Sequence, residues 1–99
     1  MDLGNTLKKI RKHRGLKQDV LASRCNISIT YLSQLENNKK SATLLTLKKI
    51  SESLNVPLPV LFFLSMRLED ISPQKKEYYS QLAPPFKTFI NDFFLDINE

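Results

Sequence analysis

The sequence predicts an all-α protein, and two observations carry that prediction. Apolar residues recur three and four positions apart through most of the 99 residues, and no segment keeps the apolar–polar alternation of a strand. Glycine occurs only twice, although β-sandwiches need frequent tight turns. A hydrophobic content of 41% with 25% charged residues indicates a folded chain. The length fits one domain, with room for an appendage.

The first two predicted helices are separated by a glycine. The first covers about residues 3–13, and Gly15 ends it because glycine accepts the left-handed conformation of a helix stop. The second covers residues 18–25 and is interrupted by Asn26, since asparagine is the non-glycine residue that best tolerates that conformation. Apolar residues mark the buried face of both helices: Leu3, Leu7, Ile10, Leu21 and Cys25.

The next two predicted helices have side-chain caps. Ser28 is placed to accept a hydrogen bond from the free amides of a third helix over residues 28–37. A fourth helix begins from a cap at Ser41 or Thr43 and ends at Asn55. Apolar residues again recur at helical spacing in both: Leu32, Leu35, Leu44, Leu47, Ile50 and Leu54.

Prolines divide the remainder of the chain. Pro57 and Pro59 flank the start of a fifth helix that runs to about Leu68, and Pro73 is suited to the first position of a sixth. The pair at residues 84–85 predicts a break, which gives at most seven helices. After this break a wide apolar stripe follows one helix face: Phe86, Phe89, Ile90, Phe93, Phe94 and Ile97.

The positive charge is concentrated at the amino-terminal end. Residues 1–40 hold nine Lys and Arg against three Asp and Glu, whereas residues 41–99 hold six against seven. Such a distribution is typical of a surface that faces a polyanion, namely DNA, RNA or an anionic membrane. A basic face that merely contacts solvent is the alternative that charge alone leaves open.

Other classes of protein find little support in the composition. Cys25 has no second cysteine for a disulfide, and a single histidine cannot build a metal site, so we expect no metal and no cofactor. No nucleophile–base or metal constellation is evident, so we expect no enzyme. The amino terminus lacks a signal-peptide pattern, and the longest apolar run, residues 60–64, is far too short to cross a bilayer. We therefore expect a soluble cytoplasmic protein without membrane contact.

The segment from Gln18 to Glu36 has the residues that two short helices meeting at a steep angle require. Ala22 supplies the small side chain for close packing, and Asn26 suits the tight turn. Five apolar residues would face a shared core: Leu21, Cys25, Ile27, Leu32 and Leu35. The outer face of the second helix then carries five others: Ser28, Ile29, Thr30, Ser33 and Gln34.

These residues resemble the phage-repressor and Cro-like helix-turn-helix family, also called XRE-like, over about residues 7–64. The resemblance includes Gly15-Leu-Lys-Gln, Ile27-Ser, Tyr31-Leu-Ser-Gln-Leu-Glu-Asn and Asn55-Val-Pro, in register. Asn26 and Asn38 depart from it, because the family usually has glycine there. Both departures are compatible with the fold, since asparagine accepts a left-handed backbone.

The resemblance implies a five-helix repressor-like DNA-binding domain over residues 1–70 and a helical extension over residues 71–99. It implies that Arg11 and Glu36 form a structural ion pair. Four residues would contact phosphates of double-stranded DNA: Gln18, Ser28, Asn37 and Lys39. Four others would read bases in the major groove: Ile29, Thr30, Ser33 and Gln34.

Two of the base-reading positions have a specific chemistry. The amide of Gln34 is able to pair with adenine N6 and N7, and Ile29 is suited to contact with a thymine methyl group. The alternative for Ile29 is that it folds back onto the core.

The function implied is a sequence-specific transcriptional regulator, of the repressor or restriction–modification controller type. The alternative is an antitoxin that binds a toxin through its tail and represses its own gene through the DNA-binding domain. The aromatic tail is too apolar to leave in water, so it packs on its own domain or forms a homodimer that reads a pseudo-palindromic site. We favour the dimer, with these candidate interface residues: Phe86, Phe89, Ile90, Phe93 and Phe94.

Overall fold

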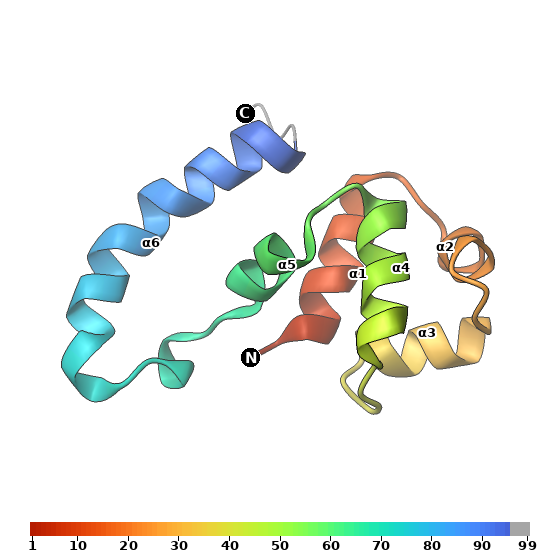
Figure 1. The fold of residues 1–99 in the computed structure, drawn as a ribbon, viewed down its shortest axis with the longest axis horizontal. Coiled ribbons are helices and arrows are strands. Elements are labelled where there is room, and N and C mark those ends of the chain that lie inside the picture. Colours follow the sequence, from red (N-terminus) through yellow and green to blue (C-terminus); the bar gives the residue numbers. More distant parts are fainter. Residues whose placement is uncertain (96–99) are drawn as a thin grey trace.

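The structure is a computed structural model that describes residues 1–95, and in this range every regular element is helical (Figure 1). The α-helices are α1 (Leu3–His13), α2 (Gln18–Arg24), α3 (Ile29–Glu36), α4 (Leu44–Leu54), α5 (Leu58–Ser65) and α6 (Lys76–Ile90). Short helical turns are η1 (Leu68–Asp70), η2 (Pro73–Lys75) and η3 (Asn91–Leu95). The predicted all-α class is confirmed. Ile97 of the predicted stripe lies outside the described residues.

Local capping explains where several of these helices begin and end. The Asp2 carboxylate accepts from the amide of Asn5 at the start of α1, and Thr43 Oγ1 accepts from the amide of Thr46 at 3.1 Å at the start of α4. Asn55 ends α4 in the left-handed conformation, with φ of 55°. Each cap therefore provides a partner for backbone groups that a helix end leaves free.

The two asparagines that depart from the family pattern both have a left-handed backbone. Asn26 has a φ of 55° and Asn38 a φ of 58°. Asparagine reaches this region at a lower cost than most side chains. The backbone geometry of Asn26 and Asn38 thus confirms the prediction that asparagine is compatible with the fold at these positions.

The hydrophobic core joins all five amino-terminal helices. Burial of each large apolar side chain contributes roughly 1.5–3 kcal/mol, so this core is the main source of stability for the packed helices. Leu95, from the far end of the chain, is buried in the same cluster. The buried members are Leu7, Ile10, Leu21, Ala22, Cys25, Leu32, Leu35, Leu47, Ile50, Leu54, Val56, Leu61 and Leu95.

The carboxyl-terminal extension differs from the sequence prediction at Pro84 and Pro85. These prolines lie inside α6, which curves and continues through them instead of breaking (Figure 1). Proline removes the amide that would bond to the carbonyl four residues earlier, here those of Ser80 and Gln81. Both of these residues are exposed, so water can satisfy their carbonyl groups. A smaller difference is that α5 ends at Ser65, before the predicted boundary.

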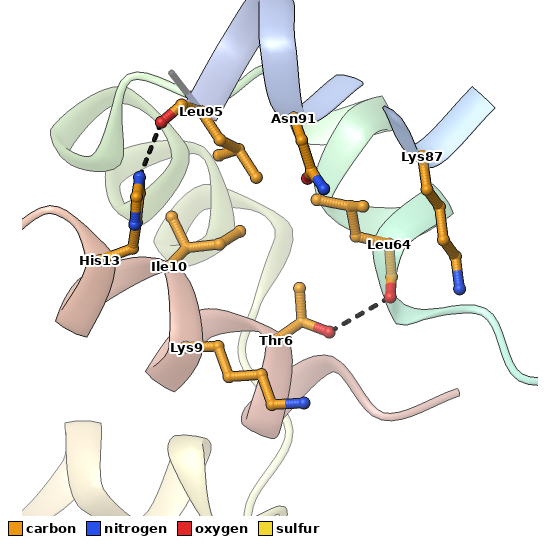
Figure 2. Close-up of a pocket in the computed structure, with 8 residues that line it drawn as sticks. All are labelled: Thr6, Lys9, Ile10, His13, Leu64, Lys87, Asn91 and Leu95. Carbon is orange, nitrogen blue, oxygen red and sulfur yellow. Dashed lines mark hydrogen bonds between the residues drawn. The ribbon is translucent and has the colours of Figure 1, made fainter. Parts of the chain in front are cut away.

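The chain after α5 runs outward through η1 and η2, and α6 then returns toward α1 and α5 (Figure 1). Arg14 connects this returning end to the core, because its guanidinium donates to the carbonyl groups of Leu54 at 2.9 Å and Phe94 at 2.6 Å. The Nε2–H of His13 donates to the carbonyl oxygen of Leu95 at 2.8 Å, as Figure 2 shows. The end of the extension is therefore attached to the carboxyl end of α1.

A hollow of about 270 Å³ remains where the extension meets α1 and α5, and Figure 2 shows its lining. Ile10, Leu64 and Leu95 form its apolar part, whereas Lys9 and Lys87 carry ammonium groups at its edge. None of the helices within residues 1–95 combines the length and the apolarity that a bilayer crossing requires.

Candidate nucleic-acid interface

Helix α3 is short, and its position depends on a cap and two anchors. Ser28 Oγ accepts a hydrogen bond from the amide of Tyr31 at 3.0 Å, which fixes the first turn. Leu32 and Leu35 project into the core and are 0% and 4% exposed. A helix of only eight residues is marginal in isolation, so these buried anchors determine that it forms and which face points outward.

The outward face of α3 gathers the predicted contact residues around one shallow hollow of about 290 Å³. Ile29, the first residue of α3, is half exposed, which excludes the alternative that this side chain folds back onto the core. None of the lining side chains is acidic. The seven lining residues are Gln18, Ile29, Thr30, Ser33, Gln34, Asn37 and Lys39. Of the eight residues predicted to contact DNA, only Ser28 does not line the hollow.

Asn37 also has a role within the chain. Its side-chain Nδ2 donates to the backbone carbonyl of Ser33 at 2.9 Å and lies 3.4 Å from the Ser33 hydroxyl oxygen. This contact adds a second hydrogen bond to a carbonyl of the last turn that already accepts from the backbone amide of Asn37 at 3.0 Å. The Asn37 carbonyl oxygen and the exposed ammonium group of Lys39 extend the polar surface beyond the helix end.

Arg11 and Glu36 form a buried ion pair beneath α3. Arg11 Nε donates to Glu36 Oε2 at 2.7 Å and Nη2 donates to Oε1 at 3.1 Å, so the guanidinium meets the carboxylate through two parallel bonds. The two side chains are 8% and 0% exposed. Arg11 Nη1 also donates to the carbonyl of Leu16 at 2.8 Å. The only carboxylate of α3 is thereby neutralised from within the chain.

The same carboxylate orients a residue of the outer surface. Gln18 Nε2 donates to Glu36 Oε1 at 3.1 Å, which ties the first residue of α2 to the last residue of α3. The remaining amide hydrogen and the carbonyl oxygen of Gln18 stay available to an external partner. Arg11, Glu36 and Gln18 therefore connect three helices behind the candidate surface.

Asp2 and Gly4, which the sequence did not single out, hold the carboxyl end of α3 through Asn38. The Asn38 side chain accepts from the amide of Gly4 at 2.9 Å and donates to the Asp2 carboxylate at 2.6 Å. Hydrogen bonds from Asn38 and from Arg67 lower the pKa of Asp2 below its ordinary value. Gly4 is buried so closely that a Cβ there would lie 2.4 Å from the Leu35 carbonyl oxygen. An early glycine inside an apolar helix pattern was the available signal for this contact.

The five candidate interface residues of the extension are divided between two faces. Phe86, Phe89 and Phe93 are 59%, 55% and 67% exposed. Ile90 is buried at 5% exposure, and Phe94 is half buried. Thus the predicted single stripe serves two surfaces, because one part of it already packs within the chain.

Cys25 and Tyr31 belong to the core or pack against it. Cys25 is fully buried, with its sulfur 3.6 Å from the hydroxyl oxygen of Ser53. Tyr31 is half buried and packs against the core cluster. Within residues 1–95, no group of three or more His, Cys, Asp and Glu is close enough to hold a metal ion.

Comparison with known proteins places the similarity in the amino-terminal part of the chain. The helix-turn-helix family model matches residues 7–61, which contain α2 and α3 and end in α5. Control protein C.MunI of Mycoplasma sp is 42% identical over 60 residues, which are 60% of this chain and 81% of the relative.

Two further relatives are longer than the matched part. The HTH-type transcriptional regulator SutR of Escherichia coli (strain K12) is 44% identical over 55 residues, 56% of this chain and 31% of the relative. The immunity repressor protein of Bacillus phage phi105 is 33% identical over 61 residues, 62% of this chain and 42% of the relative. The chain therefore spans less than half the length of these two, and all of α6 lies outside the family match.

Proposed function

The chain belongs to the helix-turn-helix family, in its phage-repressor and Cro-like group, and we propose from this that it is a DNA-binding transcriptional regulator of the repressor or controller type. The observation that carries the proposal is the outward face of α3, where seven polar or apolar side chains surround one hollow without an acidic group. The major groove of B-DNA is about 12 Å wide and admits one helix. The activity is binding, with no chemical step.

Four side chains of α3 are proposed to read base edges. The Gln34 amide presents a donor and an acceptor that match adenine N7 and N6. Ile29, half exposed at the amino end of the helix, offers an apolar surface for a thymine methyl group. Thr30 and Ser33 carry hydroxyl groups that either donate or accept, so they add contacts with less discrimination.

Four others are proposed to contact phosphates and so set the register of α3 on the duplex. Gln18 and Asn37 both line the hollow, each with part of its amide engaged within the chain. Lys39 supplies the positive charge and Ser28 caps the entering helix end. Such contacts favour every sequence alike, whereas the four base-reading residues distinguish between sequences.

We also propose that residues 1–70 form the DNA-binding unit and that the extension from residue 71 pairs two copies. The relatives named as control protein and immunity repressor support a regulatory role. A two-fold dimer would place its two recognition helices about 34 Å apart, one helical turn of DNA, on a pseudo-palindromic site.

Selection of bound duplexes from a random pool tests this function. The proposal expects an enriched pseudo-palindromic sequence for the unchanged protein. It expects a Gln34→Ala variant to lose preference at one base pair of each half-site. Gln81→Ala is the matched control, because Gln81 is an exposed glutamine on α6, far along the chain from α3. Recovery of unenriched DNA by the unchanged protein would exclude sequence-specific binding.

A further inference from the structure

The outer face of α6 and of the turn that follows it carries an apolar stripe that the chain leaves mostly exposed. Its five side chains follow one another at intervals of four, four, three and four residues, the spacing of one helix face. All are more than half exposed. We call this set the outer stripe: Tyr78, Leu82, Phe86, Phe89 and Phe93.

The outer stripe lies mainly on a different side of α6 from the residues by which the extension packs on its own chain. Ala83 and Ile90 are buried and fall between the stripe positions on another side of the helix, and Leu95, which follows the last stripe position, is also buried. Arg14 and His13 hold the end of the extension through the carbonyl groups of residues 94 and 95. Phe86 of the stripe also contacts Phe63 of α5, with the ring centroids 5.7 Å apart, yet it stays 59% exposed. Because Arg14 and His13 already attach the end of the extension, most of the outer stripe is not needed for that attachment.

The exposed apolar area is large for a chain of this size. Four of the five side chains are aromatic, and each such side chain presents roughly 200 Å² when fully exposed, so the four leave about 500 Å² uncovered. The largest apolar patch of a typical monomer is roughly 300–600 Å² and is often functional. A stable interface of standard size buries about 800 Å² on each partner. The outer stripe and its polar margin therefore suffice for one protein–protein contact.

The spacing of the stripe identifies a second copy of this chain as the occupant. Read from either end, the intervals are nearly the same, with Phe86 in the middle. Antiparallel alignment of two copies sets Tyr78 opposite Phe93 and Leu82 opposite Phe89, while Phe86 meets its own equivalent. A surface that matches itself about a two-fold axis forms a closed dimer.

We propose that the outer stripe joins two copies of this chain, with their α6 helices antiparallel and Phe86 at the two-fold axis. This proposal rests on the proposed function in one respect: it names the surface through which the two copies proposed above would pair. Its own evidence is the position, exposure and spacing of the stripe.

Charge at the two ends of the stripe favours the antiparallel direction. Lys75 lies exposed at the amino end of α6, and Asp92 lies exposed near its carboxyl end. Parallel helices would set each of these charges beside its equivalent and would align the two helix dipoles unfavourably. Antiparallel helices bring each lysine to the carboxyl end of the partner helix, where the helix dipole is negative.

Sedimentation of the full chain without DNA tests the interface. Leu82→Glu and Phe89→Glu each introduce a charge beside Phe86 within the stripe and are expected to raise the dissociation constant of the dimer at least about 100-fold. Gln81→Glu adds the same charge to an exposed residue beside the stripe and is expected to change it less than about threefold. Thermal unfolding verifies that each variant is folded; Leu82 is exposed and the aromatic contact of Phe89 is with the adjacent Phe93 ring.

Cross-linking tests the direction of the two helices. Single cysteines replace Leu82 or Phe89, and a short thiol-reactive cross-linker is added; Cys25 is buried and does not compete. Antiparallel pairing predicts cross-linked dimers mainly when the L82C and F89C proteins are mixed. Efficient linkage within L82C alone would indicate parallel helices and would overturn the proposed arrangement.

Two further outcomes would overturn the interface. One is an unchanged protein that remains monomeric up to about 100 μM, a hundredfold above a micromolar dissociation constant. The outer stripe would then be a binding surface for a different protein. The other is a Phe89→Glu variant as dimeric as Gln81→Glu. Since neither measurement includes DNA, they are independent of whether α3 reads a sequence.

Discussion

Removal of the negative charge beneath α3 is expected to destabilise the whole domain. Glu36→Gln keeps the shape of the side chain but leaves the Arg11 guanidinium facing an amide that offers one acceptor instead of two charged oxygens. Breaking a buried ion pair by changing one partner costs about 3–5 kcal/mol. Arg11 keeps its bond to the Leu16 carbonyl, so we expect the lower end of this range, about 3 kcal/mol.

A loss of this size is readily measured in a chain of 99 residues. A domain with a total stability of about 5–15 kcal/mol would lose a large part of it. The melting temperature should fall by about 12–24 °C, at roughly 4–8 °C for each kcal/mol. Urea unfolding followed by circular dichroism gives the free energy, and thermal unfolding gives the midpoint.

The matched control is Glu69→Gln, which makes the same chemical change in an exposed pair with Arg67. We expect no measurable change there, because water and salt screen exposed charges. A Glu36→Gln protein within about 1 kcal/mol of the unchanged protein would refute the reasoning. Replacing both partners by apolar residues, as in Arg11→Met with Glu36→Leu, should recover part of the loss, since no buried charge then remains unpaired.

Three other predictions follow from features described above. Gly4→Ala should destabilise the fold by about 1–3 kcal/mol in urea unfolding, because its Cβ would meet backbone oxygens at the end of α3; a gain in stability, as expected for alanine in an open helix, would contradict the contact. Lys39→Ala should weaken binding to all DNA sequences alike and lower the slope of log affinity against log salt by about one; an unchanged slope would exclude a phosphate contact. Asp2→Asn keeps the cap but loses the charge that Asn38 and Arg67 stabilise. Because the folded-state pKa of Asp2 is lowered, its contribution is fully present at pH 7 and is lost as the pH falls from about 4 through the lower folded-state pKa. The two proteins should therefore differ by less than about 1 kcal/mol at pH 7, and the difference should shrink steadily below pH 4; a difference that does not shrink on acidification would contradict this.

The helices up to Asn55 were predictable because their signals are local. Ser28 and Thr43 accept hydrogen bonds where the sequence suggested caps, and the left-handed Asn26 and Asn38 lie where the fold requires a turn. The grouping of the α3 residues around one hollow also follows from helical spacing. Leu32 and Leu35 fix the buried side of the helix, and the remaining positions then face outward.

The extension was less predictable because its structure depends on contacts distant in sequence. Pro84 and Pro85 predict a break from local chemistry alone, yet burial of Ala83 and Ile90 on either side keeps α6 continuous. The division of the aromatic stripe into an inner and an outer face likewise depends on where α1 and α5 lie, which no periodicity reveals. For the same reason the approach of Gly4 to the end of α3 became visible only in the structure.

Arg14 has a consequence for the spacing of DNA half-sites. This one guanidinium contacts the carboxyl end of α4 and the end of the α6 extension, so it relates the DNA-binding unit to the surface proposed for pairing. Moving one half-site by a single base pair shifts it by about 3.4 Å and rotates it by roughly 35° around the duplex. With the Arg14 hydrogen bonds in place, the DNA-binding unit cannot easily rotate relative to α6 to follow a shifted half-site. Without Arg14, this rotation has fewer restraints. The length of the gap between half-sites that this protein accepts would then be determined at a residue that touches neither the DNA nor the partner.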